Sequence, residues 1–283
     1  MLLRAFILAA AFLSSGAFLQ AGTRDPAVPD SKYVDFGKEF PFVLKIKALE
    51  KLGDNAVGTI GAHCGSAVAI GSNWVLTAGH IFPEDNICGG YISFADKERE
   101  PLPLDIIVVH GGYPKSGVGW HDIAICHTPA DIGLDFYPEI YTDFDEKNKV
   151  CTMSGFGATG TFTSGYGRSG DGLRRAGSNT ISGVDKSVLI CEPSRKGKTS
   201  LEFLICPGDS GGGLFIGNKL AGIVSYISGP PGGKKPRAVY GDTASFTRLS
   251  LYAGWVKAHM ELVETALSMG ETPDNPNILK VEP

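Results

Sequence analysis

The sequence lacks the charge balance and the motifs of several large protein classes. Lysine and arginine total 26 against 30 aspartate and glutamate residues, a formal net charge of −4. Nucleic-acid binding calls for a basic patch or stripe, so this mild acidity argues against a nucleic-acid partner. No two cysteines form a CxxC pair and no DxDxDG loop occurs, so neither a zinc site nor a calcium loop is expected. We therefore expect no metal and no cofactor.

Long apolar runs are also missing, and the only candidate is a short one at the N-terminus. Residues 5–13 (AFILAAAFL) are apolar, follow a single arginine and precede small residues. This pattern predicts a signal peptide over residues 1–21, cleaved after Ala17 or Ala21, because the run is too short for a comfortable membrane span. A membrane-anchoring helix is the alternative interpretation. We expect an exported, soluble protein, secreted or periplasmic, that has no membrane contact after the signal peptide is removed.

Export changes the interpretation of the cysteines. In an oxidising compartment disulfides are the better explanation for them than metal binding. Six cysteines allow 15 connectivities, and the sequence alone does not choose among them. They are Cys64, Cys88, Cys126, Cys151, Cys191 and Cys206.

The remaining chain is rich in short apolar runs separated by turn residues. Hydrophobic residues make up 43% of the chain, enough for a sizeable core, and the 38 glycines suit many turns. Runs of Val, Ile, Leu and aromatic residues at short spacing predict an all-β barrel or sandwich. Such runs occur at 41–49, 64–79, 103–110, 122–128, 150–157, 187–193, 201–205, 213–217, 220–227 and 238–246.

The strand-like runs fall into two sets, which suggests two units. We expect an N-terminal arm or propeptide over 22–32, a first unit over 33–137 and a second over 138–249, with residues 158–178 in exposed loops. Apolar residues at helical spacing predict a helix over 250–269. The proline-rich residues 270–283 are expected to form a flexible tail.

Three short segments contain residues suited to nucleophilic catalysis. WVLTAGH ends at His80, HDIAIC contains Asp122, and CPGDSGGGLF contains Ser210. A hydroxyl is a poor nucleophile near neutral pH, so it needs a base within hydrogen-bond reach and a third group that orients the base. The glycines beside Ser210 would let the backbone N–H groups of Gly208 and Ser210 point at a developing oxyanion. Taken singly, each residue is more often structural; jointly, and in this order, they indicate a catalytic site.

These segments resemble the signature segments of the chymotrypsin/trypsin-like serine proteases. The order His, Asp, Ser along the chain is that of this family, and the likeness runs from about Phe40 to Met260. The resemblance implies two six-stranded antiparallel Greek-key barrels with the active site between them, and a C-terminal helix. It also implies that His80 is the base, Asp122 orients it and Ser210 forms an acyl-enzyme with a polypeptide substrate.

The resemblance also suggests cysteine pairs, although this sequence departs from the family pattern. Cys88 is the nearest candidate partner for Cys64, and Cys191–Cys206 is a second candidate bridge. The family's usual cysteine after the nucleophile strand is Ile216 here, so Cys151 must pair otherwise or stay free. A buried free thiol and a bridged one remain equally open for Cys126.

By the same resemblance, the substrate pocket has no acidic residue at its base. Gap-free counting back from Ser210 places Leu204 there, where a preference for arginine or lysine would need a buried aspartate. A shallow apolar pocket predicts cleavage after a small or medium apolar residue. The expected lining is Leu204, Ile205, Ser225, Tyr226, Ile227 and Ala238.

Activation and the competing functions stay open at this point. Family members usually bury a new N-terminal ammonium against the residue that is Asp209 here; cleavage after Lys32 would release Tyr33, and folding without processing is nearly as well supported. A protease-like binding protein without catalysis is the alternative function, and an esterase is a third, because acyl transfer does not demand an amide. The oligomeric state is left undetermined.

Overall fold

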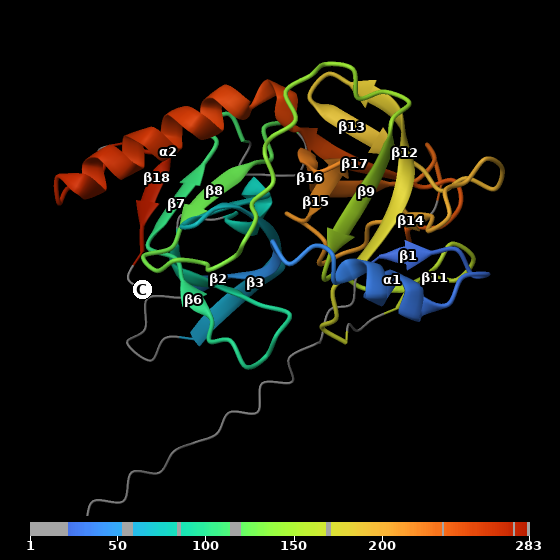
Figure 1. Ribbon diagram of the computed structural model, residues 1–283, viewed down its shortest axis with the longest axis horizontal. Coiled ribbons are helices and arrows are strands. Elements are labelled where there is room, and N and C mark those ends of the chain that lie inside the picture. The colour runs from blue at the N-terminus through green and yellow to red at the C-terminus, as the bar shows by residue number, and fades with distance from the viewer. Residues whose placement is uncertain are drawn as a thin grey trace, which may run out of the picture.

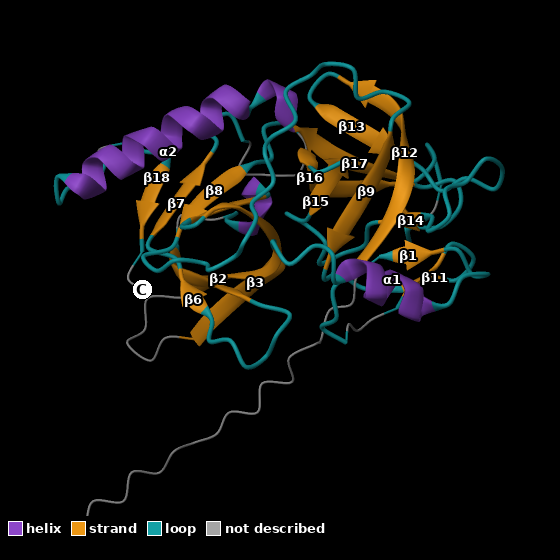
Figure 2. Cartoon of the chain, viewed as in Figure 1, coloured by secondary structure: helices purple, strands orange, loops and turns teal. Residues whose placement is uncertain are grey.

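Strands are the main regular secondary structure of the computed structural model, which describes residues 22–52, 59–83, 86–113, 120–167, 171–233, 235–273 and 275–281. The predicted signal peptide lies outside the described residues. Two strand-rich halves lie side by side, and the helices lie at the periphery (Figures 1 and 2). The helical segments are α1 (Asp30–Gly37), α2 (Ala253–Ser268) and the short turns η1 (Gly79–Ile81) and η2 (Leu249–Leu251).

The N-terminal half is a sheet of eight strands in the order β18-β7-β8-β4-β3-β2-β5-β6. Only Leu104 and Asp105 separate β6 from β7, and the Leu104 N–H donates to the carbonyl of Gly90 in β5 at 2.9 Å. The chain therefore passes within two residues from the edge strand β6 to β7, which lies second from the opposite edge, so the sheet is strongly curved. The strands are β2 (Val43–Leu52), β3 (Thr59–Gly71), β4 (Trp74–Thr77), β5 (Ile87–Ser93), β6 (Leu102–Pro103), β7 (Ile106–Val109), β8 (Ala124–His127) and β18 (Ile278–Lys280).

The C-terminal half is a closed six-stranded barrel in the order β12-β13-β17-β16-β15-β9. The predicted fold class, all-β with a C-terminal helix, is confirmed. Only the second half is a closed six-stranded barrel, whereas the first half is an eight-stranded sheet that includes the C-terminal strand β18. The barrel strands are β9 (Val150–Gly155), β12 (Arg175–Asp185), β13 (Val188–Cys191), β15 (Gly213–Ile216), β16 (Lys219–Ser228) and β17 (Thr243–Arg248).

A small third sheet contains the beginning of the described chain. Its order is β11-β10-β1-β14, formed by β1 (Thr23–Arg24), β10 (Gly160–Thr161), β11 (Gly165–Tyr166) and β14 (Phe203–Leu204). Thr23 is fully buried, and Tyr33 in α1 is equally buried with its hydroxyl donating to the carbonyl of Glu202 at 3.1 Å. The expectation of a separate arm over 22–32 was therefore wrong, because β1 pairs with β14 and β10. Residues 158–178 are loops only in part, since β10, β11 and the start of β12 lie among them.

The C-terminal segment packs on the first half. Val256 and Val263 of α2 are buried, and the Trp74 indole N–H donates to Glu264 at 2.8 Å. Beyond α2, strand β18 pairs with β7, and Val281 is 3% exposed. The expected flexible tail is therefore wrong for residues 278–281, because their apolar side chains cover an open sheet edge. No helix in the described ranges is long and apolar enough to cross a membrane.

Aromatic side chains join the two halves. The ring of Phe215 in β15 lies 5.3 Å from that of Phe40 and 5.4 Å from that of Phe42, measured between ring centroids. All three side chains are buried and belong to one core cluster. Such contacts add specific ring geometry to the burial of apolar area, so they fix how the halves meet.

The cysteines of the first half do not pair as proposed. None of the six cysteines, all of which lie in the described ranges, is in a disulfide. Strand β2 pairs with β3 on one side and with β5 on the other, so it separates Cys64 from Cys88. The Cys88 thiol instead donates to the carbonyl of Leu49. The proposed Cys64–Cys88 bridge is therefore wrong.

The cysteines of the second half meet in a different combination. The Sγ atom of Cys191 lies 3.8 Å from that of Cys151, because β9 and β13 both flank β12 and both cysteines point into the barrel. The proposed Cys191–Cys206 bridge is not formed. Cys126 is a fully buried thiol whose pKa is raised by desolvation.

We expect thiol reagents to divide the cysteines by burial. In the folded protein, Cys64 is exposed and Cys88 is partly exposed, so about two equivalents should react rapidly, and the four buried thiols only after unfolding. A chromogenic disulfide added before and after denaturant would measure both numbers. Fewer than six thiols in the denatured, unreduced protein would instead reveal a bridge, and a rise from four thiols to five on Cys151→Ser would place it at Cys151.

Candidate active site

The three predicted catalytic residues lie where strands end. His80 is in the turn η1 directly after β4, and Asp122 precedes β8, the strand that pairs with β4. Ser210 lies in the turn between β14 and β15 of the second half. Antiparallel pairing of β4 with β8 sets Thr77 opposite Ala124, so the chain segments that carry His80 and Asp122 leave the sheet side by side.

The structure brings His80 and Asp122 into direct contact. The His80 Nδ1 atom lies 2.8 Å from the Asp122 Oδ2 atom, and the His80 backbone N–H donates to Oδ1 at 2.9 Å. The Asp122 side chain is fully buried, whereas the His80 side chain is 20% exposed. A buried carboxylate that accepts the Nδ1 proton fixes the tautomer and leaves Nε2 free to accept a proton.

Two residues of the second half complete the surroundings of Asp122. The hydroxyl of Ser225 in β16 donates to Oδ2, and the hydroxyl of Thr247 in β17 donates to the main-chain carbonyl of Asp122 at 2.7 Å. Burying an ionised carboxylate is costly unless hydrogen bonds satisfy it. Thr247 was not anticipated from the sequence, because its contact depends on how the halves dock.

The turn that contains Ser210 packs against the strand end that precedes His80. The Ser66 N–H in β3 donates to the Ser210 carbonyl at 2.7 Å. Gly211 has φ +82°, and a Cβ atom there would lie 2.1 Å from the Thr77 Oγ1 atom and 3.1 Å from the Ala78 nitrogen. This close approach requires glycine.

The hydroxyl of Ser210 itself makes no hydrogen bond to any described residue, His80 included. The predicted row of three groups is thus present as a bonded His80–Asp122 pair with the serine turn beside it. Hydrogen bonds to a nucleophile are often long or misaligned in a free enzyme, so this geometry does not argue against a catalytic role.

Backbone amides around Ser210 alternate between bonded and free. The Asp209 N–H donates to Cys206 at 3.0 Å, and the Gly211 N–H donates to Val224 at 2.9 Å. The N–H groups of Gly208 and Ser210 have no acceptor among the residues that the structure describes. Gly208 reaches this conformation at φ +95°, where other residues are strained. Two free amides at the base of one turn can stabilise an anionic oxygen.

Asp209, next to the serine, is a second fully buried carboxylate. It accepts backbone N–H groups from Gly157 at 2.7 Å, Cys206 at 2.8 Å and Gly22 at 3.1 Å. Burial raises the pKa of Asp209 to about 7, against an ordinary 3.8. No cationic side chain forms an ion pair with it in the described part of the chain.

The residue that reaches Asp209 is Gly22, whereas the sequence suggested Tyr33. Gly22 has φ +63°, and a Cβ atom there would lie 1.9 Å from the Phe203 ring, so only glycine fits. Lys32 and Tyr33 lie inside α1, and a chain that began at Tyr33 would lose β1 and the first turn of α1. The position of Gly22 directly after one predicted signal cleavage site was the available sequence signal.

Only some of the predicted substrate-pocket residues lie close to one another. Leu204 pairs with Thr23, whose hydroxyl donates to the carbonyl of Ala238 at 2.6 Å, so β1 connects Leu204 with Ala238. Leu204 and Ala238 are fully buried and Ile205 is 3% exposed. In β16, Ile227 packs on the core of the second half.

Two of the predicted pocket residues have other contacts. The Ser225 hydroxyl donates to Asp122, so it is not free to bind a substrate. Tyr226 lines a separate hollow together with Trp120 and Lys186.

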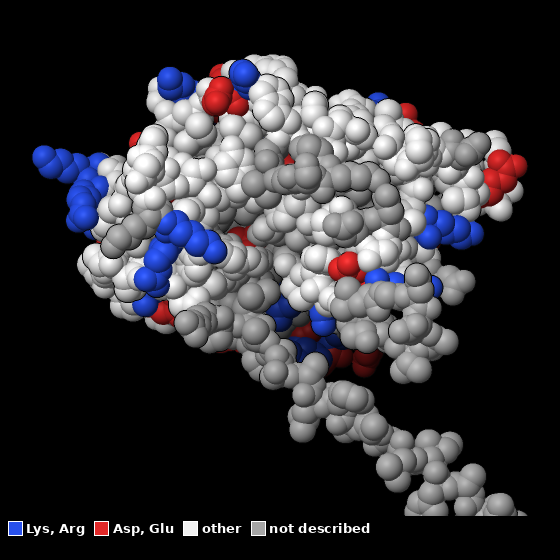
Figure 3. Space-filling view, turned by 180° about the vertical axis from the view of Figure 1, so that it is seen from behind, with Lys and Arg blue, Asp and Glu red and all other residues white. Residues whose placement is uncertain are grey.

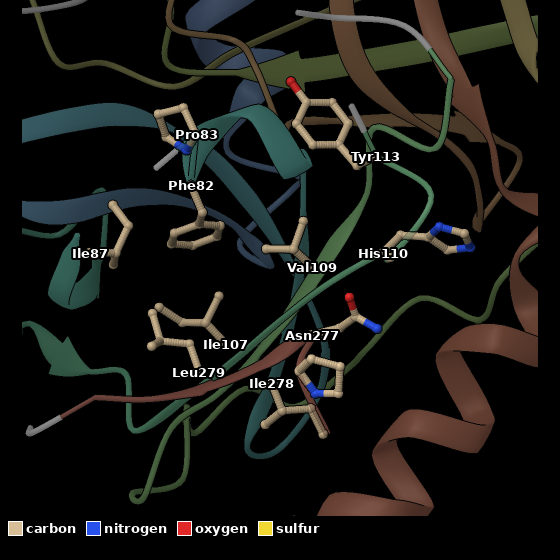
Figure 4. Close-up of a pocket in the computed structure, with 12 residues that line it drawn as sticks. Phe82, Pro83, Ile87, Ile107, Val109, His110, Tyr113, Asn277, Ile278 and Leu279 are labelled. Atoms are coloured by element: carbon tan, nitrogen blue, oxygen red, sulfur yellow. The ribbon is translucent and has the colours of Figure 1, made fainter. Parts of the chain in front are cut away.

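A pocket of 190 Å³ lies on the first half, beside the segment that follows His80 (Figure 4). Phe82 and Ile87 face Ile107 and Leu279 across it, with His110 and Tyr113 toward one end. None of the predicted substrate-pocket residues lines it. Among the described residues, no group of three or more His, Cys, Asp or Glu side chains could hold a metal ion.

Known proteins share both the sequence pattern and the fold. Human kallikrein-8 is 29% identical over 211 residues, which cover 69% of this chain and 75% of kallikrein-8. Lectizyme from Glossina austeni is 29% identical over 259 residues, 79% of this chain and 83% of lectizyme. Trypsin Tyr p 3.0101 from Tyrophagus putrescentiae is 25% identical over 225 residues, 72% of this chain and 74% of that protein.

Solved structures share the fold at lower sequence identity. Neuropsin, a serine protease expressed in the limbic system of mouse brain, superposes with a TM-score of 0.59 at 18% identity, covering 78% of this chain and 95% of neuropsin. A mutant of human heparin binding protein gives the same TM-score at 16% identity, covering 80% and 93%. The family model described as Trypsin matches residues 38–255. The similar proteases support a proteolytic function. Because the family match spans most of the sequence, the chain belongs to the trypsin family.

Proposed function

We propose that the protein is an exported serine endopeptidase that hydrolyses peptide bonds through an acyl-enzyme. Ser210 attacks the carbonyl carbon, His80 Nε2 takes the hydroxyl proton and returns it to the leaving amine, and Asp122 stabilises the charged imidazole. Water then attacks the acyl group, His80 takes a proton from this water, and the proton passes to the Ser210 oxygen as the acid product leaves. The observation that carries the proposal is the fully buried Asp122 carboxylate, 2.8 Å from His80 Nδ1.

The amides of Gly208 and Ser210 would stabilise the tetrahedral intermediate. They have no acceptor among the described residues, so an oxyanion could bind both without breaking a bond in the protein. Preorganised donors of this kind typically contribute about 100- to 1,000-fold to turnover. The N-terminal sequence pattern supports export, with the mature protein secreted or periplasmic.

Polypeptides are the proposed partners, and nucleic acid is not. On the face seen in Figure 3, lysine and arginine side chains form small separate groups with aspartate and glutamate among them. No continuous basic stripe crosses that face, which agrees with the net charge of −4.

The first prediction concerns Ser210. A fluorophosphonate should label the purified protein at Ser210, and peptide hydrolysis should fall by at least about 10,000-fold in Ser210→Ala because the nucleophile is lost. Intact mass of the labelled protein and a peptide assay measure the two effects, and Ser182→Ala, a surface serine on β12, is the matched control. An unlabelled, inactive wild type would favour the alternative, a catalytically silent binding protein. Faster turnover of esters with no peptide cleavage would favour an esterase.

The second prediction concerns substrate choice. The expected pocket has buried apolar residues at Leu204, Ile205 and Ala238, so a cation entering it would lose hydration without gaining a carboxylate partner. Small or medium apolar residues should therefore be cleaved at least about tenfold faster than arginine or lysine at the position before the scissile bond. A peptide library that varies only this position measures the ratio. A dominant arginine or lysine preference would contradict the pocket assignment.

We further propose that removal of residues 1–21 activates the enzyme. The Gly22 nitrogen contacts Asp209 at 3.1 Å, and if the chain begins at Gly22 this nitrogen becomes an ammonium ion beside a buried carboxylate. Asp209 adjoins the Gly208 and Ser210 amides, so the ion pair would hold the oxyanion-binding turn in place. One processing step would then both remove the leader and complete the site.

The third prediction compares a chain that starts at Gly22 with one that retains Ala21. With Ala21 attached, the folded-state pKa of Asp209, about 7, exceeds its ordinary 3.8, so stability should fall as pH rises from about 4 to 7. In the chain that starts at Gly22, the ammonium should lower the pKa of Asp209 and prevent this fall in stability. The free energy of unfolding of the two chains should then differ by up to about 4 kcal/mol near pH 7. The advantage should disappear as pH rises through the pKa of the ammonium, above about 8.

Thermal unfolding between pH 4 and 9 measures this difference, and hydrolysis should be faster from the Gly22 form. Chemical acetylation of Gly22 is the matched control, because it removes the charge and keeps the chain length. Equal stability curves and equal activity for the two chains would disprove the activation step.

A further inference from the structure

Two cations lie over one aromatic ring close to the Ser210 turn. The Lys45 Nζ atom is 5.0 Å from the centroid of the Phe156 ring, and the guanidinium carbon of Arg174 is 5.5 Å from the same centroid. Phe156 is 2% exposed, so the two cations cover it. Like charges this close repel each other, and a shared aromatic ring offsets only part of that cost.

Neither cation has a carboxylate partner among the described residues. Arg174 donates from Nη1 to the carbonyl of Gly37 at 3.3 Å, and its buried Nε has no acceptor in the described ranges. The nearby carboxylate of Asp171 is occupied by Arg175, with contacts of 3.0 and 2.8 Å. Burial and the neighbouring cations Lys97 and Arg174 lower the pKa of Lys45. Lys45 and Arg174 therefore form a partly buried cationic cluster without a neutralising carboxylate in the described part of the chain, and such a cluster favours binding of an anion.

Short contacts connect this cluster to the serine turn. Lys45 in β2 pairs directly with Ser66 in β3. The Ser66 hydroxyl accepts the Phe156 N–H at 3.1 Å and donates to the Gly208 carbonyl at 3.1 Å. Cross-strand partners have Cβ atoms roughly 5 Å apart on one face, so the Lys45 side chain starts next to the residue that holds Gly208 and Ser210.

The cluster lies on the opposite side of the turn from the expected substrate pocket. Strand β16, which carries Ser225 to Ile227, holds the turn through the hydrogen bond from Gly211 to Val224. Ser66 holds the turn from the first half, and Lys45 and Phe156 lie next to Ser66 rather than next to β16. A substrate whose acyl side occupies the pocket must therefore extend its leaving-group side over the cluster.

We propose that Lys45 and Arg174 bind an acidic side chain of the polypeptide substrate, one or two residues after the scissile bond. Each extended residue of the substrate advances the chain by about 3.4 Å. A side chain one or two residues after the scissile bond would therefore lie within reach of the Lys45 side chain, which begins beside Ser66. This inference rests on the proposed endopeptidase activity and specifies its substrate class. It divides recognition between an apolar pocket before the cut and a cationic site after it.

The fourth prediction uses peptide pairs that differ only by glutamate or glutamine at each of the first two positions after the cut. At one of them, glutamate should raise kcat/KM about tenfold at low salt, and the ratio should shrink in 0.5 M salt, which screens charges beyond about 3–5 Å. Lys45→Met and Arg174→Met should each reduce the ratio, and the double variant should bring it close to one. Lys45→Glu should reverse the preference in favour of lysine.

Two controls separate this inference from the proposed activity and from misfolding. Lys257→Met removes one charge from α2 and should keep the wild-type ratio. A substrate that ends in a chromogenic amide has no residue after the cut, so wild type and double variant should cleave it equally. Cleavage of all peptides with no difference between glutamate and glutamine would refute the acidic site alone, whereas no cleavage of any peptide would refute the proposed endopeptidase.

Discussion

The buried carboxylate of Asp122 is the constraint on which the arrangement of the candidate site depends. An ionised carboxylate without exposure is tolerated only if polar groups surround it. Its surroundings come from both halves: His80 of the first half and the Ser225 hydroxyl of the second contact the carboxylate, and the Thr247 hydroxyl donates to the main-chain carbonyl of Asp122. Separating the halves would remove the hydrogen bond from Ser225 and the one from Thr247. The docking that satisfies Asp122 is the same docking that brings the Ser210 turn next to His80, so stability and site geometry have one cause.

Asp209 is also a buried carboxylate, but backbone N–H groups surround it instead of side chains. Three backbone N–H groups surround it, and one of them belongs to Gly22, 187 residues away in the chain. Amides alone leave the pKa of Asp209 raised to about 7, so a large part of the cost of burying its charge remains. A chain terminus formed by cleavage would supply a cation at this position without changing a side chain. The first described residues therefore belong to the candidate site through the contact of Gly22 with Asp209.

The sequence predicted best where chemistry dictates residue types within short segments. His80, Asp122, Ser210 and Gly208 could be proposed from the sequence because a nucleophile, its base and its backbone donors need particular residue types, and the structure places His80 against Asp122. The strands around them followed from runs of β-branched and apolar residues. Prediction failed where a segment's structure depends on a distant partner. Residues 278–281 form a strand only because β7 offers an open edge, and Thr23 is buried only because β14 and Ala238 enclose it.

The cysteine pairs also show that a sequence does not predict contacts between distant segments. Counting along the chain made Cys88 the neighbour of Cys64, yet β2 runs between them in the sheet. Cys191 was assigned to Cys206, but strand order in the barrel turns it toward Cys151. Order along the chain cannot reveal such neighbours, because it contains no information on which strand lies between two others.

Lys45, Phe156 and Arg174 illustrate what topology adds to function. They are separated by 111 and 18 residues, and no motif connects them. Lys45 faces Ser66 by strand register, Phe156 reaches Ser66 through its N–H at the end of β9, and Arg174 comes just before β12, the strand that pairs with β9. The same Ser66 holds Gly208 and Ser210. One strand of the first half thus holds the turn of Gly208 and Ser210 and, through its neighbours, the proposed cationic site, so the candidate catalytic turn and the proposed recognition site share a single element.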